Sequence, residues 1–233
     1  MKSLSVFARG VILAAFLFAA STQAQAQTDA ANPATPLYTS FETIERLQQG
    51  GYVMVIRHER TEYPSRADDY SALPTECRAQ RNLSAAGVVS VHENGQLIRA
   101  AAIPVMRVIT SPMCRASETA RYLFGSDYET DARLMHHEPG EMSKRSLDQA
   151  ASETAAAIRE LAPLPAGSNV AVISHGGNIF KGTGLRLSEG EVGVLQIDEI
   201  GAFTLIGQFT GGTLGFYVRM KEEEAKREAG ESE

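Results

Sequence analysis

Three short, largely apolar segments place the strongest constraint on how this chain of 233 residues can fold. They occupy residues 52–56, 105–109 and 169–174. Their length and composition are typical of strands that are covered on both faces in a parallel sheet. Segments with helical spacing alternate with them, at residues 84–102, 116–124 and 146–161. The alternation predicts an α/β fold, a three-layer α/β/α sandwich with a central, mostly parallel sheet.

The C-terminal part of the chain carries weaker signals. Short strands are expected at residues 193–197, 202–208 and 214–219. The last two have a spacing that permits antiparallel pairing, and a further short strand is expected to end at Leu134. Residues 221–233 are dominated by charge, which predicts a solvated tail, either a frayed helix or a segment without regular structure.

The N-terminal residues have the order of a secretory signal peptide. Lys2 and Arg9 precede an apolar run at residues 11–20, and a small-residue pattern ends at Ala26. Because the run is shorter than the roughly 20 residues that span a bilayer, we expect cleavage and no membrane span afterwards. This predicts a periplasmic or secreted protein of bacterial type. The expected division is a signal peptide at residues 1–26, a linker at 27–38, one domain at 39–220 and a charged tail at 221–233.

The charge of the chain limits its partners. The formal net charge is −6 at pH 7, and loss of Lys2 and Arg9 with the signal peptide makes the protein more acidic. An acidic surface repels nucleic-acid backbones and anionic lipids, so general binding to either is disfavoured. Any anion site must therefore be a local cluster of basic residues.

The chain contains two cysteines, Cys77 and Cys114. Export to an oxidising compartment permits a disulfide between them, and two buried thiols are the alternative. A bridge would tie the aperiodic segment at residues 61–81, which is expected to be a long loop, to the segment around residue 114.

Polar residues follow each of the three apolar segments, at the positions where ligands bind in open α/β sheets. Arg57 and His58 follow the first segment, and Arg115 comes soon after the second. His175 follows the third. Guanidinium groups match the oxygens of phosphate, and a histidine with a pKa near ~6.5 can be a neutral nucleophile at physiological pH. If the strands are neighbours, these residues form a set that suits a phosphate dianion.

The ordered motifs resemble those of the histidine phosphatase superfamily, in its phosphoglycerate mutase-like branch. The signature Arg-His-Gly-x-Thr of that family is matched by Arg57-His58-Glu59-Arg60-Thr61. The resemblance continues through residues 81–87, 111–120 and 174–176, and it covers the chain from about residue 51 to 190. The chain is similar to a small exported bacterial member of this family.

The resemblance implies a role for each residue of the set. In the family, the histidine that matches His58 is phosphorylated, and water then releases phosphate. The residues that match Arg57, Arg115 and His175 bind the phosphoryl oxygens. Phosphoryl transfer needs in-line positioning and neutralisation of oxygen charge, which fixed arginines provide. We therefore expect a phosphatase that uses no metal and no cofactor.

Two features concern carboxylates near the site. Glu59 stands where the family usually has glycine or another small residue, so it is expected either to point away from the anion site or to tune it. An alkoxide leaving group needs a proton donor. Glu138 is the predicted acid because residues 134–140 loosely resemble the Leu-x-Glu-x-x-Gly pattern of mutase-like members. Glu191 is the competing candidate because it follows the His175 segment, and Glu141 is a third.

Some polar residues have less specific contexts. Thr61 and Asn178 each lie within one turn of a predicted catalytic histidine, which makes them candidates for substrate binding. His136 and His137 are interpreted as loop or pocket-rim residues, because neighbours in sequence rarely face one metal ion. Surface ion pairing is the default expectation for four further arginines: Arg78, Arg81, Arg99 and Arg121.

The sequence therefore predicts a phosphomonoester hydrolase that forms a phosphohistidine on His58. A small or envelope-associated phosphate ester is the expected substrate, which rests on the resemblance to exported members. One alternative is phosphotransfer of the phosphoglycerate mutase type, which the signal peptide disfavours because that substrate is cytosolic. The other is a non-catalytic module that binds phosphate or a phosphorylated ligand in the same pocket.

Overall fold

The computed structural model describes residues 36–70, 76–136, 145–164 and 166–230. All of them belong to one compact unit. The predicted signal peptide lies outside the described residues, as do residues 27–35 of the predicted linker. Within the described ranges, no helix is long and apolar enough to cross a membrane.

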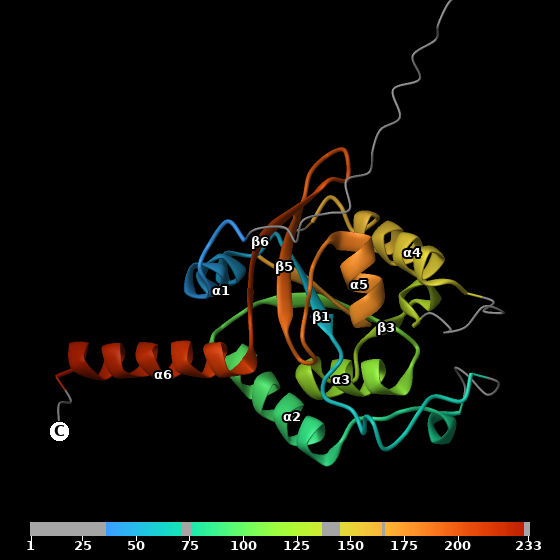
Figure 1. Ribbon diagram of the computed structural model, residues 1–233. Coiled ribbons are helices and arrows are strands. Elements are labelled where there is room, and N and C mark those ends of the chain that lie inside the picture. Colours follow the sequence, from blue (N-terminus) through green and yellow to red (C-terminus); the bar gives the residue numbers. More distant parts are fainter. Residues whose placement is uncertain (1–35, 71–75, 137–144, 165, 231–233) are drawn as a thin grey trace, which may run out of the picture. The chain divides into compact units, whose positions relative to one another are not determined.

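A six-stranded sheet forms the centre of the domain (Figure 1). Its strands are β1 (Val53–Arg57), β2 (Val105–Thr110), β3 (Glu129–Thr130), β4 (Asn169–Ser174), β5 (Val192–Ile197) and β6 (Phe203–Phe209). Their order across the sheet is β3-β2-β4-β1-β5-β6. The first four strands in that order pair in parallel, whereas β5 is antiparallel to both β1 and β6. The predicted mostly parallel sheet is confirmed, and β5 is the strand that departs from it.

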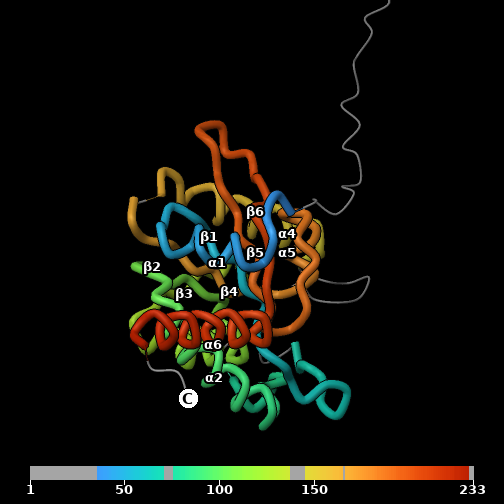
Figure 2. The backbone as a smooth tube through the Cα atoms, turned by 90° about the vertical axis from the view of Figure 1, so that its left-hand side faces the viewer, coloured from blue at the N-terminus to red at the C-terminus, as the bar shows by residue number. Residues whose placement is uncertain are grey.

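Helices cover both faces of this sheet (Figures 1 and 2). They are α1 (Ser40–Gln49), α2 (Ala85–Ala100), α3 (Cys114–Phe124), α4 (Leu147–Arg159), α5 (Gly176–Thr183) and α6 (Gly211–Glu228). Helices α4 and α5 pack together on one face, and α1, α2, α3 and α6 lie on the other. Figure 2 shows α6 running beside α2.

Alternate residues of β1 face the two helical layers. Met54 and Ile56 belong to the core formed with α1, α2, α3 and α6, whereas Val53 and Val55 belong to the core formed with α4 and α5. All four are at most 1% exposed. A strand covered on both faces needs apolar side chains on both, so the strand has an unbroken apolar sequence. The three-layer α/β/α sandwich is therefore confirmed.

Some expectations about local structure are wrong. Residues 214–219 lie in α6, so the antiparallel pair at this end of the chain is β5 with β6. The branched and aromatic side chains favoured a strand, but Leu214, Tyr217 and Val218 have helical spacing and are buried together. The solvated tail takes the helical one of its two expected forms, because residues 221–228 continue α6 with exposed side chains. Leu134 ends a short 3-10 helix after β3 instead of a strand.

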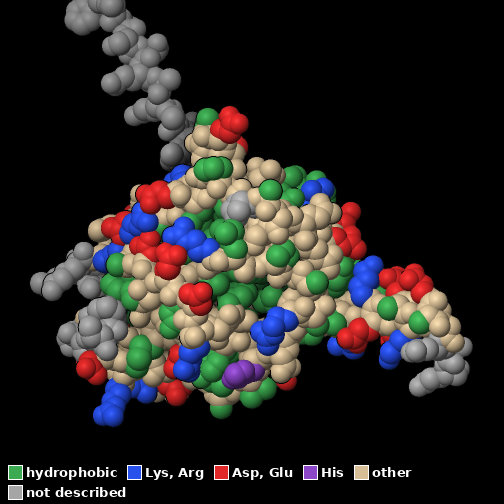
Figure 3. All heavy atoms as spheres, turned by 180° about the vertical axis from the view of Figure 1, so that it is seen from behind, with side chains coloured by type: hydrophobic (Ala, Val, Ile, Leu, Met, Phe, Trp, Pro, Cys, Tyr) green, Lys and Arg blue, Asp and Glu red, His purple; other side chains and the backbone are tan. Residues whose placement is uncertain are grey.

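Basic and acidic side chains are intermixed on the face of the molecule that Figure 3 shows. Among the residues drawn in colour, charges of one sign do not gather over that face. The described residues of the face shown there therefore form no broad surface of one charge that would attract an anion.

Candidate active site

The polar residues that follow β1, β2 and β4 meet at the C-terminal ends of these strands. Strand β4 lies between β2 and β1. Arg57 at the end of β1 is paired with Ser174, and Thr110 at the end of β2 is paired with Ile173. Because these strand ends are level, the residues that follow them come together, as the sequence predicts.

The ring of His58 is held in one orientation at the end of β1. Its backbone N–H donates to the carbonyl of Ser174 at 3.1 Å. The ring Nδ1 lies 2.9 Å from the carbonyl oxygen of Glu59, so Nδ1 carries the proton and Nε2 keeps a lone pair. Burial, and after it the positive charge of Arg115, holds the pKa of His58 well below its usual range. The imidazole is therefore neutral at physiological pH, with Nε2 available for attack.

A second imidazole, that of His175, lies beside the first, with ring centroids 5.3 Å apart. Its Nε2 is 2.9 Å from Oγ of Ser111. Its Nδ1 is buried and has no hydrogen-bond partner among the described residues. Burial, followed by the charge of Arg115, also lowers the pKa of His175 well below the usual range. The ring is therefore neutral and has one nitrogen free for a ligand.

His136 borders this pair from the other side. Its ring packs edge-on against that of His175, with centroids 5.1 Å apart, and its Nδ1 is 3.3 Å from the hydroxyl of Tyr70. This position fits the predicted pocket-rim role, while His137 lies outside the described residues. In the described part of the chain, no group of three or more His, Cys, Asp or Glu side chains is arranged to hold a metal ion.

Arg115 lies in the first turn of α3 and is completely buried. Its Nη1 donates to Oδ1 of Asp68 at 3.0 Å and to the carbonyl of Arg81 at 3.3 Å. Its Nε is buried without a partner among the described residues. Burial lowers the pKa of Arg115 and Asp68 opposes that shift, but arginine stays charged in proteins. A buried guanidinium with an unused donor, beside two neutral histidines, is suited to an anion.

Arg57 supplies the second guanidinium. Its Nη1 donates to the carbonyl of Leu187 at 3.0 Å, and its Nη2 lies 3.6 Å from Oε1 of Glu189. Its Nε is buried and has no partner in the described part of the chain. The start of α5 packs closely against this side chain: a Cβ atom at Gly176 would lie 3.0 Å from Nε of Arg57. Glycine thus permits the approach that brings the end of β4 next to Arg57.

The sequence matches no protein-family model and no curated protein. Solved structures do resemble the chain. The protein histidine phosphatase SixA, complexed with tungstate, is 17% identical with a TM-score of 0.50, and the match covers 70% of this chain and 99% of that one. The mycobacterial glucosyl-3-phosphoglycerate phosphatase, complexed with VO3, is 16% identical with a TM-score of 0.53, and the match covers 69% and 99%. A phosphoserine phosphatase from Entamoeba histolytica, in complex with 3-phosphoglyceric acid, is 14% identical with a TM-score of 0.52, and the match covers 68% and 96%. The chain has the histidine phosphatase fold.

Glu59, which the sequence places at a position where a small residue was expected, does not enter the anion site. Its Oε1 accepts hydrogen bonds from Ser90 at 2.7 Å and Asn94 at 3.1 Å, and its Oε2 accepts one from the backbone N–H of Arg60 at 2.9 Å. The carboxylate is therefore bound to α2. Of the two possibilities expected from the sequence, Glu59 points away from the anion site and does not tune it. Gly190, with φ of 79°, leaves the necessary room, because a Cβ atom there would lie 2.4 Å from Oε1 of Glu59.

The structure describes only one of the three carboxylates that the sequence predicts as candidate proton donors. Glu138 and Glu141 lie outside the described residues. The Oε2 of Glu191 accepts a hydrogen bond from the backbone N–H of Ser188 at 2.8 Å, so this carboxylate is bound within its own turn. Glu189, which the sequence analysis missed, instead lies beside Arg57. Residues 188–191 alternate Ser, Glu, Gly and Glu, and the sequence gives no signal for which glutamate faces the site.

Thr61 and Asn178 occupy different surroundings. The hydroxyl of Thr61 donates to Oε1 of Glu189 at 3.1 Å, which places it near Arg57. The amide nitrogen of Asn178 donates to the carbonyl of Met135 at 2.7 Å, and its Oδ1 is buried without a partner among the described residues. Their roles in substrate binding stay predictions.

The sulfur atoms of Cys77 and Cys114 lie at bonding distance. The pair joins the 3-10 helix Cys77–Ala79 to the first residue of α3, next to Arg115. In the same place, the side chain of Gln80 accepts a hydrogen bond from the backbone N–H of Cys114 at 2.8 Å. Of the two arrangements that the sequence left open, the structure has the geometry of the bridge.

Asp68 is a second residue that the sequence analysis missed. It lies in the aperiodic segment at residues 61–81, and no spacing relates it to Arg115. Its side chain is 6% exposed, and Oδ1 accepts hydrogen bonds from Arg115 and from the backbone N–H of Arg81, the latter at 2.8 Å. Asp68 thus fixes the guanidinium of Arg115 from the side of the long loop.

Proposed function

We propose that this chain is an exported, metal-independent phosphomonoester hydrolase that forms a phosphohistidine on His58. The observation that carries the proposal is that Arg57, Arg115 and His175 lie around a neutral His58 whose Nε2 is bound by none of the residues that the structure describes. The similar structures support it, because they are named as phosphatases and two are complexed with the oxyanions tungstate or VO3.

In the first step, the phosphoryl group binds between the two guanidiniums, and Nε2 of His58 attacks phosphorus. The bond from phosphorus to the ester oxygen breaks, and that oxygen takes a proton as it leaves. The proton of His58 stays on Nδ1 and is donated in a hydrogen bond to the carbonyl oxygen of Glu59, which stabilises the positive charge of the phosphorylated ring. Arg57 and Arg115 neutralise the charge on the phosphoryl oxygens in the transition state.

In the second step, water gives a proton to the carboxylate that protonated the leaving oxygen and attacks the phosphorus, and the bond to Nε2 breaks. Inorganic phosphate leaves, and His58 returns to its neutral form. The hydroxyl of Ser111 donates to Nε2 of His175, which keeps the proton of that ring on Nδ1. The unused Nδ1 then donates to a phosphoryl oxygen in both steps.

The proton for an alkoxide leaving group comes from a carboxylic acid. Glu138 is our candidate because of its place in the mutase-like pattern. Glu189 is the alternative because its carboxylate lies 3.6 Å from Arg57 and accepts a hydrogen bond from Thr61. Glu191 is the weaker candidate because its own turn already binds its carboxylate.

Export through a cleaved signal peptide places the enzyme in the periplasm or outside the cell, where a small or envelope-associated phosphate ester is its substrate. Two observations support this location. The N-terminal residues have the order of a signal peptide. The only two cysteines of the chain have their sulfur atoms at bonding distance, an arrangement that is common in oxidising compartments.

A trapping experiment tests the proposal. The protein is incubated, in the presence of a chelator, with para-nitrophenyl phosphate whose phosphate group is labelled. The reaction is stopped with alkali, in which phosphohistidine survives. We expect chelator-resistant turnover and a labelled protein, both lost in His58→Ala. His92→Ala, which removes an exposed histidine on α2, is the matched control and should retain both. Tight phosphate binding without turnover or label would favour the non-catalytic module and overturn the proposal.

A further inference from the structure

An open pocket of about 600 Å³ lies next to the phosphoryl site. Its lining includes three arginines, Arg57, Arg60 and Arg81, and one carboxylate, that of Glu189. Glu189 already accepts a hydrogen bond from Thr61 and lies near Arg57. The pocket is thus a local excess of positive charge on a chain whose net charge is −6. Such an excess is costly unless it binds an anion.

The backbone of Arg81, at one side of this pocket, is fixed by hydrogen bonds. Its backbone N–H donates to Asp68 at 2.8 Å, and its carbonyl accepts from the buried Arg115 at 3.3 Å. The next residue, Asn82, donates to the carbonyl of Cys77 at 2.9 Å. The same network that orients the inner guanidinium therefore also fixes the backbone of Arg81.

The side chain of Arg81 has donors to spare. The expectation of a surface ion pair is wrong, because Arg81 forms no ion pair with a described residue, and its Nε is buried without a partner among them. Its guanidinium carbon lies 5.3 Å from the ring centroid of Tyr63, a cation–π contact with a ring on a residue that is 72% exposed. After burial and Arg115, the charge of Arg81 also contributes to the lowered pKa of both His58 and His175, so it acts on the phosphoryl site.

We infer that Arg81, with Arg60 and Tyr63, forms an outer subsite that binds a second anionic group of the phosphate-ester substrate. This inference rests on the proposed function, and it names the substrate class: a phosphomonoester that carries a carboxylate or a second phosphate near the ester. The inner guanidiniums hold the phosphoryl group that reacts. The planar fork of Arg81 matches either second group with paired hydrogen bonds, and the ring of Tyr63 covers the carbon chain between the two anions.

Three synthetic esters of equal chain length test the inference. Propyl phosphate has no second charge, 3-phosphonooxypropionate has a carboxylate, and propane-1,3-diyl bisphosphate has a second phosphate. We expect the protein to prefer both esters with an anionic tail over propyl phosphate in kcat/KM. In Arg81→Gln this preference should fall about 10- to 100-fold, the loss typical of a charged hydrogen bond. The ester whose preference in kcat/KM falls further identifies which of the two anions, carboxylate or phosphate, the subsite binds.

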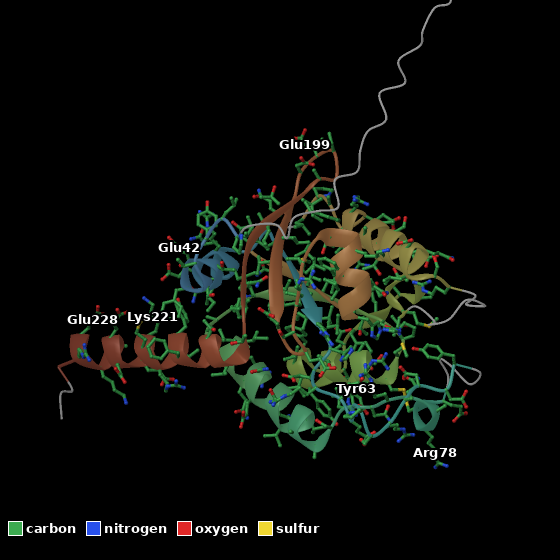
Figure 4. All side chains as sticks on the ribbon, in the orientation of Figure 1. Glu42, Tyr63, Arg78, Glu199, Lys221 and Glu228 are labelled. Atoms are coloured by element: carbon green, nitrogen blue, oxygen red, sulfur yellow. A yellow bond between two sulfur atoms is a disulfide. The ribbon has the colours of Figure 1, made fainter. Side chains whose placement is uncertain are left out.

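Arg78→Gln is the matched control. It removes the same charge from the same loop, and Figure 4 shows the side chain of Arg78 pointing away from the domain. It should leave the preference unchanged. If Arg78→Gln and Arg81→Gln lose the same preference for the anionic esters, the effect comes from net charge alone. If Arg81→Gln keeps the preference, Arg81 does not form the subsite. Either result overturns the inference. Thermal unfolding of both variants checks that each is folded.

Binding measurements separate this inference from the proposed function. Calorimetric titration of the three esters into His58→Ala, and into His58→Ala with Arg81→Gln, needs no turnover. If the first protein prefers the two anionic esters and the second does not, the subsite stands even where the wild type has no phosphatase activity. If the wild type hydrolyses all three esters without preference, the phosphatase stands and the subsite is overturned.

Discussion

His58 and Glu59 follow each other at the end of β1, and both are almost completely buried, at 2% and 3% exposed. Their surroundings are opposite. One ring nitrogen of His58 is hydrogen-bonded to a backbone carbonyl, and the other has no partner within the described ranges and lies beside two guanidiniums. Glu59 has both carboxylate oxygens bound, by Ser90, Asn94 and the backbone of Arg60.

This comparison teaches how to interpret a buried ionisable residue. Burial alone does not distinguish a reactive group from a structural one, because both need compensation for lost water. The unused polar atom makes the distinction: Nε2 of His58 accepts no hydrogen bond from a described residue, whereas both carboxylate oxygens of Glu59 accept at least one. Successive residues of an extended chain point to opposite faces, so one residue serves the site and the next serves the packing of α2.

The largest expected effect is on kcat, which should distinguish His58 from Glu59. His58→Asn removes the nucleophile and should lower kcat by about 10³-fold or more. Glu59→Gln keeps the shape and the hydrogen bonds to α2, and kcat should stay within about 5-fold of the wild type. Steady-state hydrolysis of para-nitrophenyl phosphate measures both. A Glu59→Gln loss as large as that of His58→Asn would end the distinction between them.

The comparison extends to the carboxylates that are candidates for the proton donor. An alkyl phosphate needs the acid because its alkoxide leaves poorly, whereas nitrophenolate leaves without a proton. We expect Glu138→Gln to lower kcat by about 10²-fold on an alkyl phosphate and little on para-nitrophenyl phosphate. Glu189→Gln is measured on the same two substrates. If Glu189→Gln alone shows the selective loss, the acid is Glu189.

Glu59 should show its importance in stability. Glu59→Leu leaves the hydroxyl of Ser90 and the amide of Asn94 without their acceptor inside the fold. The free energy of unfolding should fall by about 1–3 kcal/mol, the cost of unpaired buried polar groups. Urea unfolding measures it, with Glu93→Leu on the exposed side of α2 as the control. Equal stability of Glu59→Leu and the wild type would show that the α2 contacts contribute nothing.

The smallest effect concerns pH. The folded pKa values of His58 and His175 are lowered, so below about pH 6.5 the unfolded chain binds protons that the folded one does not. Stability is therefore complete above that pH and falls as the pH drops toward the folded pKa values, by about 1.4 kcal/mol per pH unit for each histidine. The decrease in unfolding free energy from pH 6.5 to 5.5 should be smaller in His175→Asn than in the wild type. Equal slopes would contradict the lowered pKa of His175.

The central strands of the sheet were predictable because a strand that is covered on both faces needs apolar side chains at successive positions. The segments that became β1 and β4 are buried along almost their whole length, whereas β2 is buried only from Val108 onward. The polar residues after β1 and β4 identified Arg57, His58 and His175 in advance. The segment at residues 214–219 was mistaken because a short run of branched and aromatic residues suits a strand or one buried helical face equally. Only packing against the neighbouring helices separates the two.

The surroundings of the site were harder to predict. Asp68, Arg81 and Glu189 act through contacts with residues far away in the sequence, and they lie in segments without periodicity. Arg81 was expected at a surface ion pair, yet its backbone is fixed between Asp68 and Arg115. Loop residues gain their partners only when the loop is placed on the sheet, so local sequence carries no trace of them.

The sequence alone determined that two arginines and two histidines would follow buried parallel strands. A run of apolar residues identifies such a strand, and the polar residues directly after the run identify its C-terminal end. The tertiary structure decided which atoms of that set are free, since hydrogen bonds across the loop at residues 59–81 and the turn at 188–191 occupy some donors and acceptors and leave others unused. Those contacts depend on the register of β1, β2 and β4 and on the path of the loops over them, which no local pattern specifies.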